Sequence, residues 1–188
     1  MRILAIADRP PSRPLREILS ETKFDLIVTL GDLDLSEIRY LELVTDIPKL
    51  GVYGNHCSGM YMPGLGIENM HMRTLEVGGM IFGGFEGCVR YKDSPFAKMY
   101  TQEEASVILA SFPRVDVMLT HCPPFGVNDE PDDVAHTGYI GLRDYVLREK
   151  PGYLLHGHTY PTENTLTNKL GNTEIIYVTG DKTVALGS

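Results

Sequence analysis

Five residues that can bind a metal ion each follow a short apolar segment of this 188-residue sequence. They are Asp8, Asp32, Asn55, His121 and His158. Glycine directly precedes Asp32, Asn55 and His158, and it lets the backbone turn sharply and approach its neighbours closely. Carboxylate and amide oxygens with imidazole nitrogens suit Mn, Fe, Zn or Ni, and Mg is a further candidate. The sequence therefore predicts a divalent metal site.

The segments that must position these residues are apolar runs alternating with amphipathic stretches. The apolar runs predict strands at residues 3–7, 26–30, 48–53, 115–120 and 153–156. Helices are expected at residues 14–21, 35–44, 101–110 and 138–149, and a loop at residues 58–72. Thr101 and Glu104 have the spacing of a capping box at the start of the third helix.

Two hairpins are expected from glycine-containing turns. Gly78-Gly79 separates residues 75–77 from 80–85, and Gly171-Asn172 separates residues 162–170 from 174–178. Early strand–helix–strand order followed by hairpins predicts an α/β sandwich with mixed sheets, formed as one domain over residues 1–188. Loops at the carboxyl ends of strands converge in such sheets, which would gather the candidate ligands.

The order of the motifs, D…GD…GNH…H…GH, resembles that of the calcineurin-like metallophosphoesterases, in particular their small prokaryotic phosphodiesterase-like members. The pattern extends from Asp8 to His158, and it is specific because its parts occur together in this order. The resemblance implies a four-layer α-β-β-α sandwich with two mixed sheets. It also implies a site for two metal ions that Asp32 bridges.

Two positions depart from the family's pattern. Pro10 replaces the histidine of the D-x-H motif, and Tyr160 replaces the second histidine of the closing G-H-x-H motif. By resemblance, both absent histidines would serve the first metal, which would keep only Asp8 and Asp32. The second metal would keep Asp32, Asn55, His121 and His158. We therefore expect one well-occupied metal site and a second that is weak or absent.

His156 allows a second alignment of the closing motif, because His156 and His158 also have the H-x-H spacing. Both histidines would then be metal ligands. In the alignment that we favour, the glycine precedes the ligand His158. His156 then orients a neighbouring ligand without binding the metal itself.

Other polar residues are candidates for substrate chemistry. By resemblance, His56 lies near the phosphate and protonates the leaving oxygen, and imidazole suits proton transfer near neutral pH. The alternative for His56 is a buried, hydrogen-bonded side chain. Arg9, in the metal-site loop, is a candidate phosphate contact. His136 either contacts substrate, as a similar His-x-Gly does in several relatives, or only begins a helix. Tyr160 hydrogen-bonds a water or substrate, or fills space.

These features predict a metal-dependent phosphoesterase that prefers phosphodiesters and uses a metal-activated water. Asp32 would position the metal, and His56 would assist the leaving oxygen. The alternative is a degenerate relative that binds a metal or nucleotide as a sensor or scaffold, which the two replaced histidines motivate. A nuclease is disfavoured by the charge and by the absence of clustered basic residues.

Composition limits the partners further. The net charge of −8 favours a small phosphorylated substrate held by metal over duplex nucleic acid. Three cysteines do not build a disulfide framework, and no apolar run approaches the roughly 18 residues of a membrane helix. We therefore expect a cytoplasmic protein without a membrane partner, and the sequence leaves the oligomeric state open.

Overall fold

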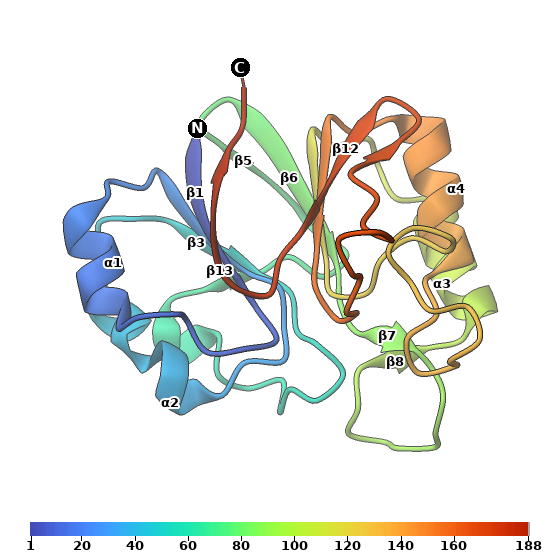
Figure 1. The fold of residues 1–188 in the computed structure, drawn as a ribbon, viewed down its shortest axis with the longest axis horizontal. Coiled ribbons are helices and arrows are strands. Elements are labelled where there is room, and N and C mark those ends of the chain that lie inside the picture. Colours follow the sequence, from blue (N-terminus) through green and yellow to red (C-terminus); the bar gives the residue numbers. More distant parts are fainter. Residues whose placement is uncertain (188) are drawn as a thin grey trace.

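Two mixed sheets form the framework of the protein, and buried aliphatic runs form their central strands. The computed structural model describes residues 1–187. One sheet has the strand order β13-β1-β2-β3-β4, and the other has the order β11-β12-β10-β9-β6-β5 (Figure 1). The mixed α/β class and the two mixed sheets expected from the sequence are confirmed.

The first sheet is parallel except at one edge. It contains β1 (Arg2–Ala7), β2 (Leu26–Thr29), β3 (Lys49–Gly51), β4 (Glu68–Asn69) and β13 (Gly180–Ala185). Strands β1 to β4 run parallel, whereas β13 pairs antiparallel with β1. All four residues of β2 are buried, which is typical of a central strand covered on both faces.

The second sheet has a parallel centre and two antiparallel edges. It contains β5 (Thr74–Val77), β6 (Met80–Phe85), β9 (Val117–Thr120), β10 (Tyr153–His156), β11 (Lys169–Leu170) and β12 (Thr173–Tyr177). Strands β6, β9, β10 and β12 run parallel, and β5 and β11 close the edges as hairpins. The short strands β7 (Cys88–Val89) and β8 (Met99–Tyr100) form a separate pair.

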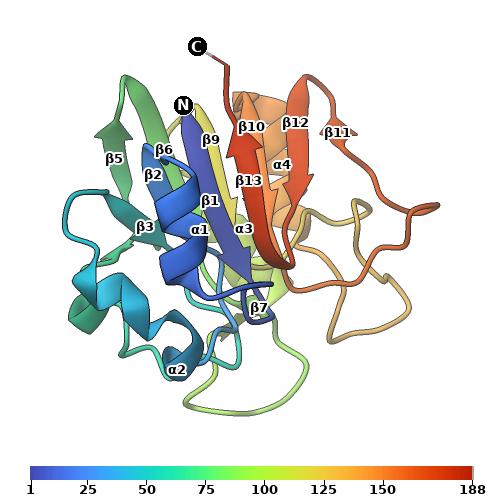
Figure 2. The same ribbon diagram turned by 60° about the vertical axis from the view of Figure 1, so that its left-hand side comes forward.

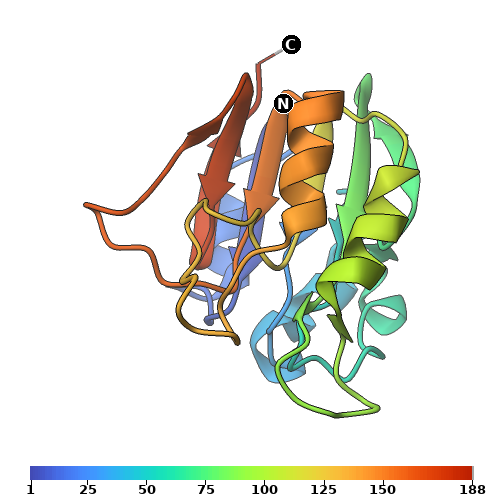
Figure 3. The same ribbon diagram turned by 90° about the vertical axis from the view of Figure 1, so that its right-hand side faces the viewer.

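Helices cover the outer face of each sheet (Figures 1 and 3). Helices α1 (Leu15–Glu21) and α2 (Leu35–Ile38) lie on the first sheet, and α3 (Gln102–Ala110) and α4 (Ile140–Glu149) lie on the second. The capping box of α3 is confirmed, because the Thr101 hydroxyl accepts from Glu104 N and the Glu104 carboxylate accepts from Thr101 N. No helix within residues 1–187 is long and apolar enough to cross a membrane.

Three apolar cores separate these layers. The inner core joins the facing sides of the two sheets, with Val28 on one side and Leu119 on the other. A second core packs α1 and α2 against the first sheet, and a third packs α3 and α4 against the second. The order of layers is therefore helices, sheet, sheet, helices, as Figure 2 also shows.

The helix expected at residues 35–44 is only partly α-helical. It begins at the Asp34 cap, and after α2 it continues as a 3₁₀ helix, η1 (Arg39–Leu43). Buried Lys49 donates its ammonium hydrogens to the carbonyls of Leu41 and Val44 at the end of this segment. Carbonyls at helix ends need such partners, and 3₁₀ turns are frequent there.

The expected loop at residues 58–72 contains two short regular elements. They are a 3₁₀ helix, η2 (Pro63–Leu65), and β4, which extends the edge of the first sheet.

Two expectations for the last third of the chain are wrong. The strand expected at residues 162–170 is regular only as β11, because Thr162 and Thr165 hydrogen-bond one another locally instead of joining a ladder. Strand β13 was not expected at all. It is an edge strand in which Val184 alone is buried, so it lacks the hydrophobic alternation that marks a strand in a sequence.

The inner core packs the two sheets against one another, so a cavity there should lower the free energy of unfolding. We expect Leu119→Ala, at a fully buried position, to lower the free energy of unfolding by about 2–5 kcal/mol. Leu75→Ala, on the exposed edge strand β5, is the matched control and should cost less than about 1 kcal/mol. Urea denaturation measures both, and equal losses would contradict the assignment of the core.

Candidate metal centre

The carboxyl ends of five strands meet at one edge of the protein. Strands β1, β2 and β3 end there from the first sheet, and β9 and β10 end there from the second. Backbone hydrogen bonds join the loops that follow: Asp8 N donates to Gly31 O at 3.1 Å, and Gly157 N donates to His121 O at 3.0 Å. The expected convergence of the strand-end residues is therefore observed.

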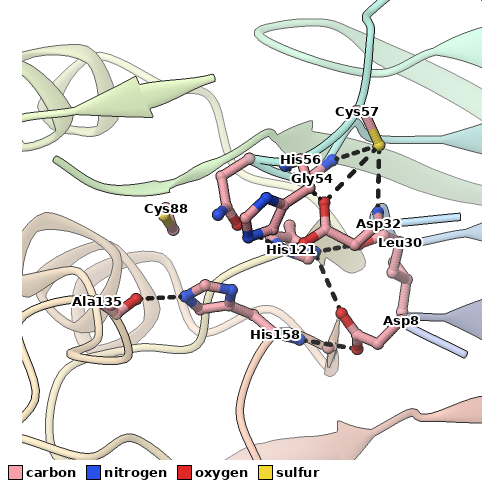
Figure 4. A network of polar contacts seen from close by, with 12 residues as sticks. Asp8, Leu30, Asp32, Gly54, His56, Cys57, Cys88, His121, Ala135 and His158 are labelled. Atoms are coloured by element: carbon pink, nitrogen blue, oxygen red, sulfur yellow. Dashed lines mark hydrogen bonds and ion pairs between the residues drawn. The ribbon is translucent and has the colours of Figure 1, made fainter. Parts of the chain in front are cut away.

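His121 lies at the centre of this cluster (Figure 4). Its Nε2 atom is 3.3 Å from Asp32 Oδ2 and 3.0 Å from Asn55 Oδ1. Asp32, His121 and His158 each offer a ligand atom, and these atoms lie within 4.8 Å of one another. Four of the five predicted ligands thus form one compact group.

Backbone carbonyls fix the orientation of both histidines. His121 Nδ1 donates to Leu30 O at 2.7 Å, and His158 Nε2 donates to Ala135 O at 2.8 Å. His121 therefore presents Nε2 to the cluster, and His158 presents Nδ1. Metal-binding histidines commonly have the second ring nitrogen bonded in this way, which sets the tautomer and the ring plane.

The protonation states follow from burial and from the nearby carboxylates. Burial disfavours charge on His121, but Asp32 and then Asp8 outweigh it and raise the pKa of His121 to about 9. Burial also acts on Asp32, yet His121 lowers the pKa of Asp32 to about 2. Burial, followed by the charge on His121, lowers the pKa of His158 to about 3. At neutral pH, the group therefore holds one proton on His121 Nε2, and His158 Nδ1 carries a free lone pair.

Three of the predicted ligand residues have left-handed backbone conformations. The φ angles are 60° at Asp8, 51° at Asp32 and 72° at His158. Residues other than glycine adopt this region rarely, and strain of this kind gathers at functional sites. The left-handed residue at each strand end turns the side chain back over the edge of the sheets.

The glycines before these ligands make room for them, as the sequence predicted. A Cβ atom at Gly54 would overlap Asp32 Oδ1, and one at Gly157 would overlap Asp8 Oδ2. Gly31 has φ of 96° and lies against the backbone of Gly54. The close approach of the loops thus depends on residues without a side chain.

Asp8 lies beside the group rather than within it. Its Oδ2 accepts the His158 backbone N–H at 2.9 Å, and its Oδ1 is 3.9 Å from His121 Nδ1. Burial raises the pKa of Asp8 to about 6. In this structure Asp8 fixes the loop of His158 and supports the charge on His121.

His156 is turned away from the group. Its Nε2 accepts from Asn128 Nδ2 at 3.0 Å, and its Nδ1 donates to Gly157 O at 3.0 Å. Burial lowers the pKa of His156 to about 4, so the ring is neutral. Because both nitrogens are engaged, this geometry favours the alignment in which His156 supports the loop of His158.

His56 and Cys57 follow Asn55 on the other flank of the group. His56 is exposed rather than buried, and its backbone N–H donates to Asp32 Oδ1 at 2.8 Å. The Cys57 thiol accepts from Asp32 N at 3.2 Å and from Gly54 N at 3.3 Å. Cys57 is thus a buried residue that supports the Asp32 loop.

The predicted substrate residues form a rim that extends from His158. The His136 ring lies 5.4 Å from the His158 ring and 5.9 Å from the Tyr160 ring, between centroids. The Arg9 guanidinium carbon lies 5.7 Å from the centroid of Tyr160. His136 Nδ1 is 2.7 Å from Asp133 Oδ2, which orients the ring. Sequence reasoning missed this partner, as well as Asn128 and the carbonyls of Leu30 and Ala135.

The residues present fit a single divalent metal. A carboxylate, an amide oxygen and two histidines with their second nitrogens bonded are a donor set of the borderline kind. The positions of Pro10 and Tyr160 supply no further ligand, since Tyr160 packs instead beside Arg9 and His136. That one metal binds well and a second weakly or not at all stays a prediction.

No protein-family model and no curated protein matches this sequence. A search of solved structures finds similar folds. One crystal structure aligns over 93% of this chain and 89% of its own length, with a TM-score of 0.65 and 17% identity. TT1561 of Thermus thermophilus aligns over 94% of this chain and 88% of its own, with a TM-score of 0.61 and 14% identity. At these identities the likeness extends to the fold alone.

A metal ion at this group must displace the proton from His121. At pH 7.5 we expect one equivalent of Mn²⁺ or Zn²⁺ to bind and to release close to one proton, because the pKa of His121 is raised to about 9. Release should fall toward zero as the pH rises above that pKa. Calorimetry in buffers with different ionisation enthalpies measures the number of protons released per metal ion bound. His121→Gln should abolish this proton release. A proton count near zero at pH 7.5 would contradict the assigned protonation state.

Proposed function

We propose that this protein is a metal-dependent phosphoesterase that hydrolyses phosphodiesters, with the metallo-dependent phosphatase variant of the four-layer fold. The observation that carries the proposal is His121 Nε2, which faces one oxygen of Asp32 and one of Asn55 with His158 alongside. The proton on His121 Nε2 lies between oxygen and nitrogen donors that would suit a metal cation in its place. The motif order of the sequence and the two-sheet fold both support this reading.

A divalent metal bound at this group would supply a Lewis acid that polarises a phosphoryl oxygen and lowers the pKa of a water. The chain's own residues hold and orient the substrate around it. Arg9 is exposed at the rim, and within residues 1–187 its guanidinium forms no hydrogen bond or ion pair. Tyr160 supports the guanidinium from one side, so its donors remain available for phosphoryl oxygens.

His56 is placed for proton transfer to the leaving oxygen. Its backbone N–H holds it beside Asp32, and its side chain is open to solvent at the mouth of the group. A histidine at that position can give a proton to the departing alkoxide. Asp32 thereby has two roles, as a metal ligand and as the acceptor that fixes the His56 loop.

A binding protein without turnover is the second candidate. The replacement of two family histidines by Pro10 and Tyr160 favours it, because by resemblance the first metal would keep only Asp8 and Asp32. Such a protein would bind a metal or a nucleotide as a sensor or scaffold. The experiment on Asp32 separates the two functions.

With added Mn²⁺, we expect wild type to hydrolyse bis(4-nitrophenyl) phosphate and Asp32→Asn to be slower by roughly 100-fold or more, because the charged ligand is lost. Asp46→Asn removes an exposed carboxylate outside the group and should leave the rate unchanged. Equal background rates in wild type and Asp32→Asn would instead support the binding protein.

Arg9→Gln should weaken the binding of inorganic phosphate to the Mn²⁺-loaded protein by about tenfold, because a charge-assisted hydrogen bond is lost. Metal stoichiometry should not change, since Arg9 is not a ligand. Arg13→Gln is the matched control, because Arg13 is already paired with Glu21 at 2.9 Å. Calorimetric titration with phosphate measures both variants. Unchanged affinity in Arg9→Gln would remove Arg9 from the site.

A further inference from the structure

A pocket of about 510 Å³ is lined in part by Tyr160, one of the rim residues. Two loops form it, at residues 126–131 and 160–167. These loops lie side by side in Figures 2 and 3, and Asn128 in one hydrogen-bonds the backbone of Thr167 in the other. The volume of the pocket is within the range of sites that bind small organic molecules.

The pocket has a fixed frame. The Asn128 side chain donates to His156 Nε2 at 3.0 Å and to Thr167 O at 2.9 Å, and its oxygen accepts from Thr167 N at 2.6 Å. Asn128 is buried and has φ of 56°. One side chain thus ties both loops to the end of β10, so the pocket is formed before any ligand arrives.

The pocket borders the metal centre through shared residues. Tyr160 belongs to its lining and to the rim beside Arg9. Glu130, also in the lining, has a carboxylate oxygen within 4.8 Å of ligand atoms of Asp133 and His136. His136 in turn packs against His158. A substrate whose phosphorus lies at the metal group can therefore extend one substituent into the pocket.

The charged residues of the lining are Asp129 and Glu130, and it contains no lysine or arginine. Asp129 uses one oxygen to accept Gly138 N at 2.9 Å, and its other oxygen has no hydrogen bond within residues 1–187. The Glu130 carboxylate has none there either. Thr162 and Thr165 also line the pocket, and their hydroxyl oxygens lie 3.1 Å apart. Negative charge with free acceptors favours a cation and repels an anion.

We propose that this pocket binds the second alcohol of a phosphodiester substrate, and that this alcohol carries an ammonium group. The inference rests on the proposed phosphoesterase function and names its substrate class. Arg9, beside the Tyr160 ring, holds the phosphoryl oxygens, and Asp129 and Glu130, in the pocket that Tyr160 also lines, hold the ammonium. The site thereby matches a zwitterionic phosphodiester.

The test uses three diesters that share one leaving group and differ only in the second alcohol. They are 4-nitrophenyl phosphorylcholine, ethyl 4-nitrophenyl phosphate and carboxyethyl 4-nitrophenyl phosphate. We expect kcat/KM to fall in that order, with about tenfold between the cationic and anionic esters. Glu130→Lys should reverse the order. The control is Glu76→Lys, which makes the same charge change on the edge strand β5 of the second sheet and should leave the order unchanged.

Each outcome separates the inference from the proposed function. The ratio of kcat/KM between two esters is not affected by a general loss of folded or metal-bound protein. If Glu130→Lys leaves the order of the three esters unchanged, the pocket assignment is therefore overturned and the phosphoesterase proposal is not. If no ester is hydrolysed, the phosphoesterase proposal fails. Calorimetric binding of phosphocholine and 2-phosphoglycolate then tests the pocket independently of turnover. Tighter binding of phosphocholine, lost in Glu130→Lys, supports the inference, and equal affinities overturn it.

Discussion

The arrangement of the site depends on one buried imidazole. His121 is wholly enclosed, and its two nitrogens are assigned to different tasks: Nδ1 to the carbonyl of Leu30 and Nε2 to the oxygens of Asp32 and Asn55. Because the ring crosses from the second sheet to the end of β2 in the first, it joins the two sheets where their strands end. A buried ionisable group must have partners to offset its desolvation, and here those partners define the metal group.

That enclosure imposes constraints on the backbone around it. Asp8, Asp32 and His158 adopt left-handed conformations, and Gly54 and Gly157 have no room for a side chain. The inner apolar core between the sheets offsets this local strain, since most of its members are fully buried. The sheets and the short strained turns together hold the donors in place.

The surroundings of the metal group are asymmetric in charge. The Arg9 guanidinium lies beside the Tyr160 ring, and Asp129 and Glu130 line the pocket that Tyr160 also borders. Tyr160 thus contacts both a basic side chain and a pocket with acidic residues. A fold that supports many reactions acquires its selectivity through such rim residues, which lie on loops and not on the strands.

The sequence by itself determined what depends on local pattern. Apolar runs predicted β1, β2, β9 and β10, a glycine pair predicted the β5–β6 hairpin, and strand-end residue types predicted which side chains gather around His121. Tertiary structure alone decided which nitrogen of His121 faces Asp32 and Asn55, that Asp8 and His156 support the loop of His158, and that Tyr160 borders a pocket. Those features rest on contacts such as Asp8 with His158 and Leu30 with His121, which are 150 and 91 residues apart. Strand β13 was missed for the same reason, because its pairing with β1 and not its own residues makes it a strand.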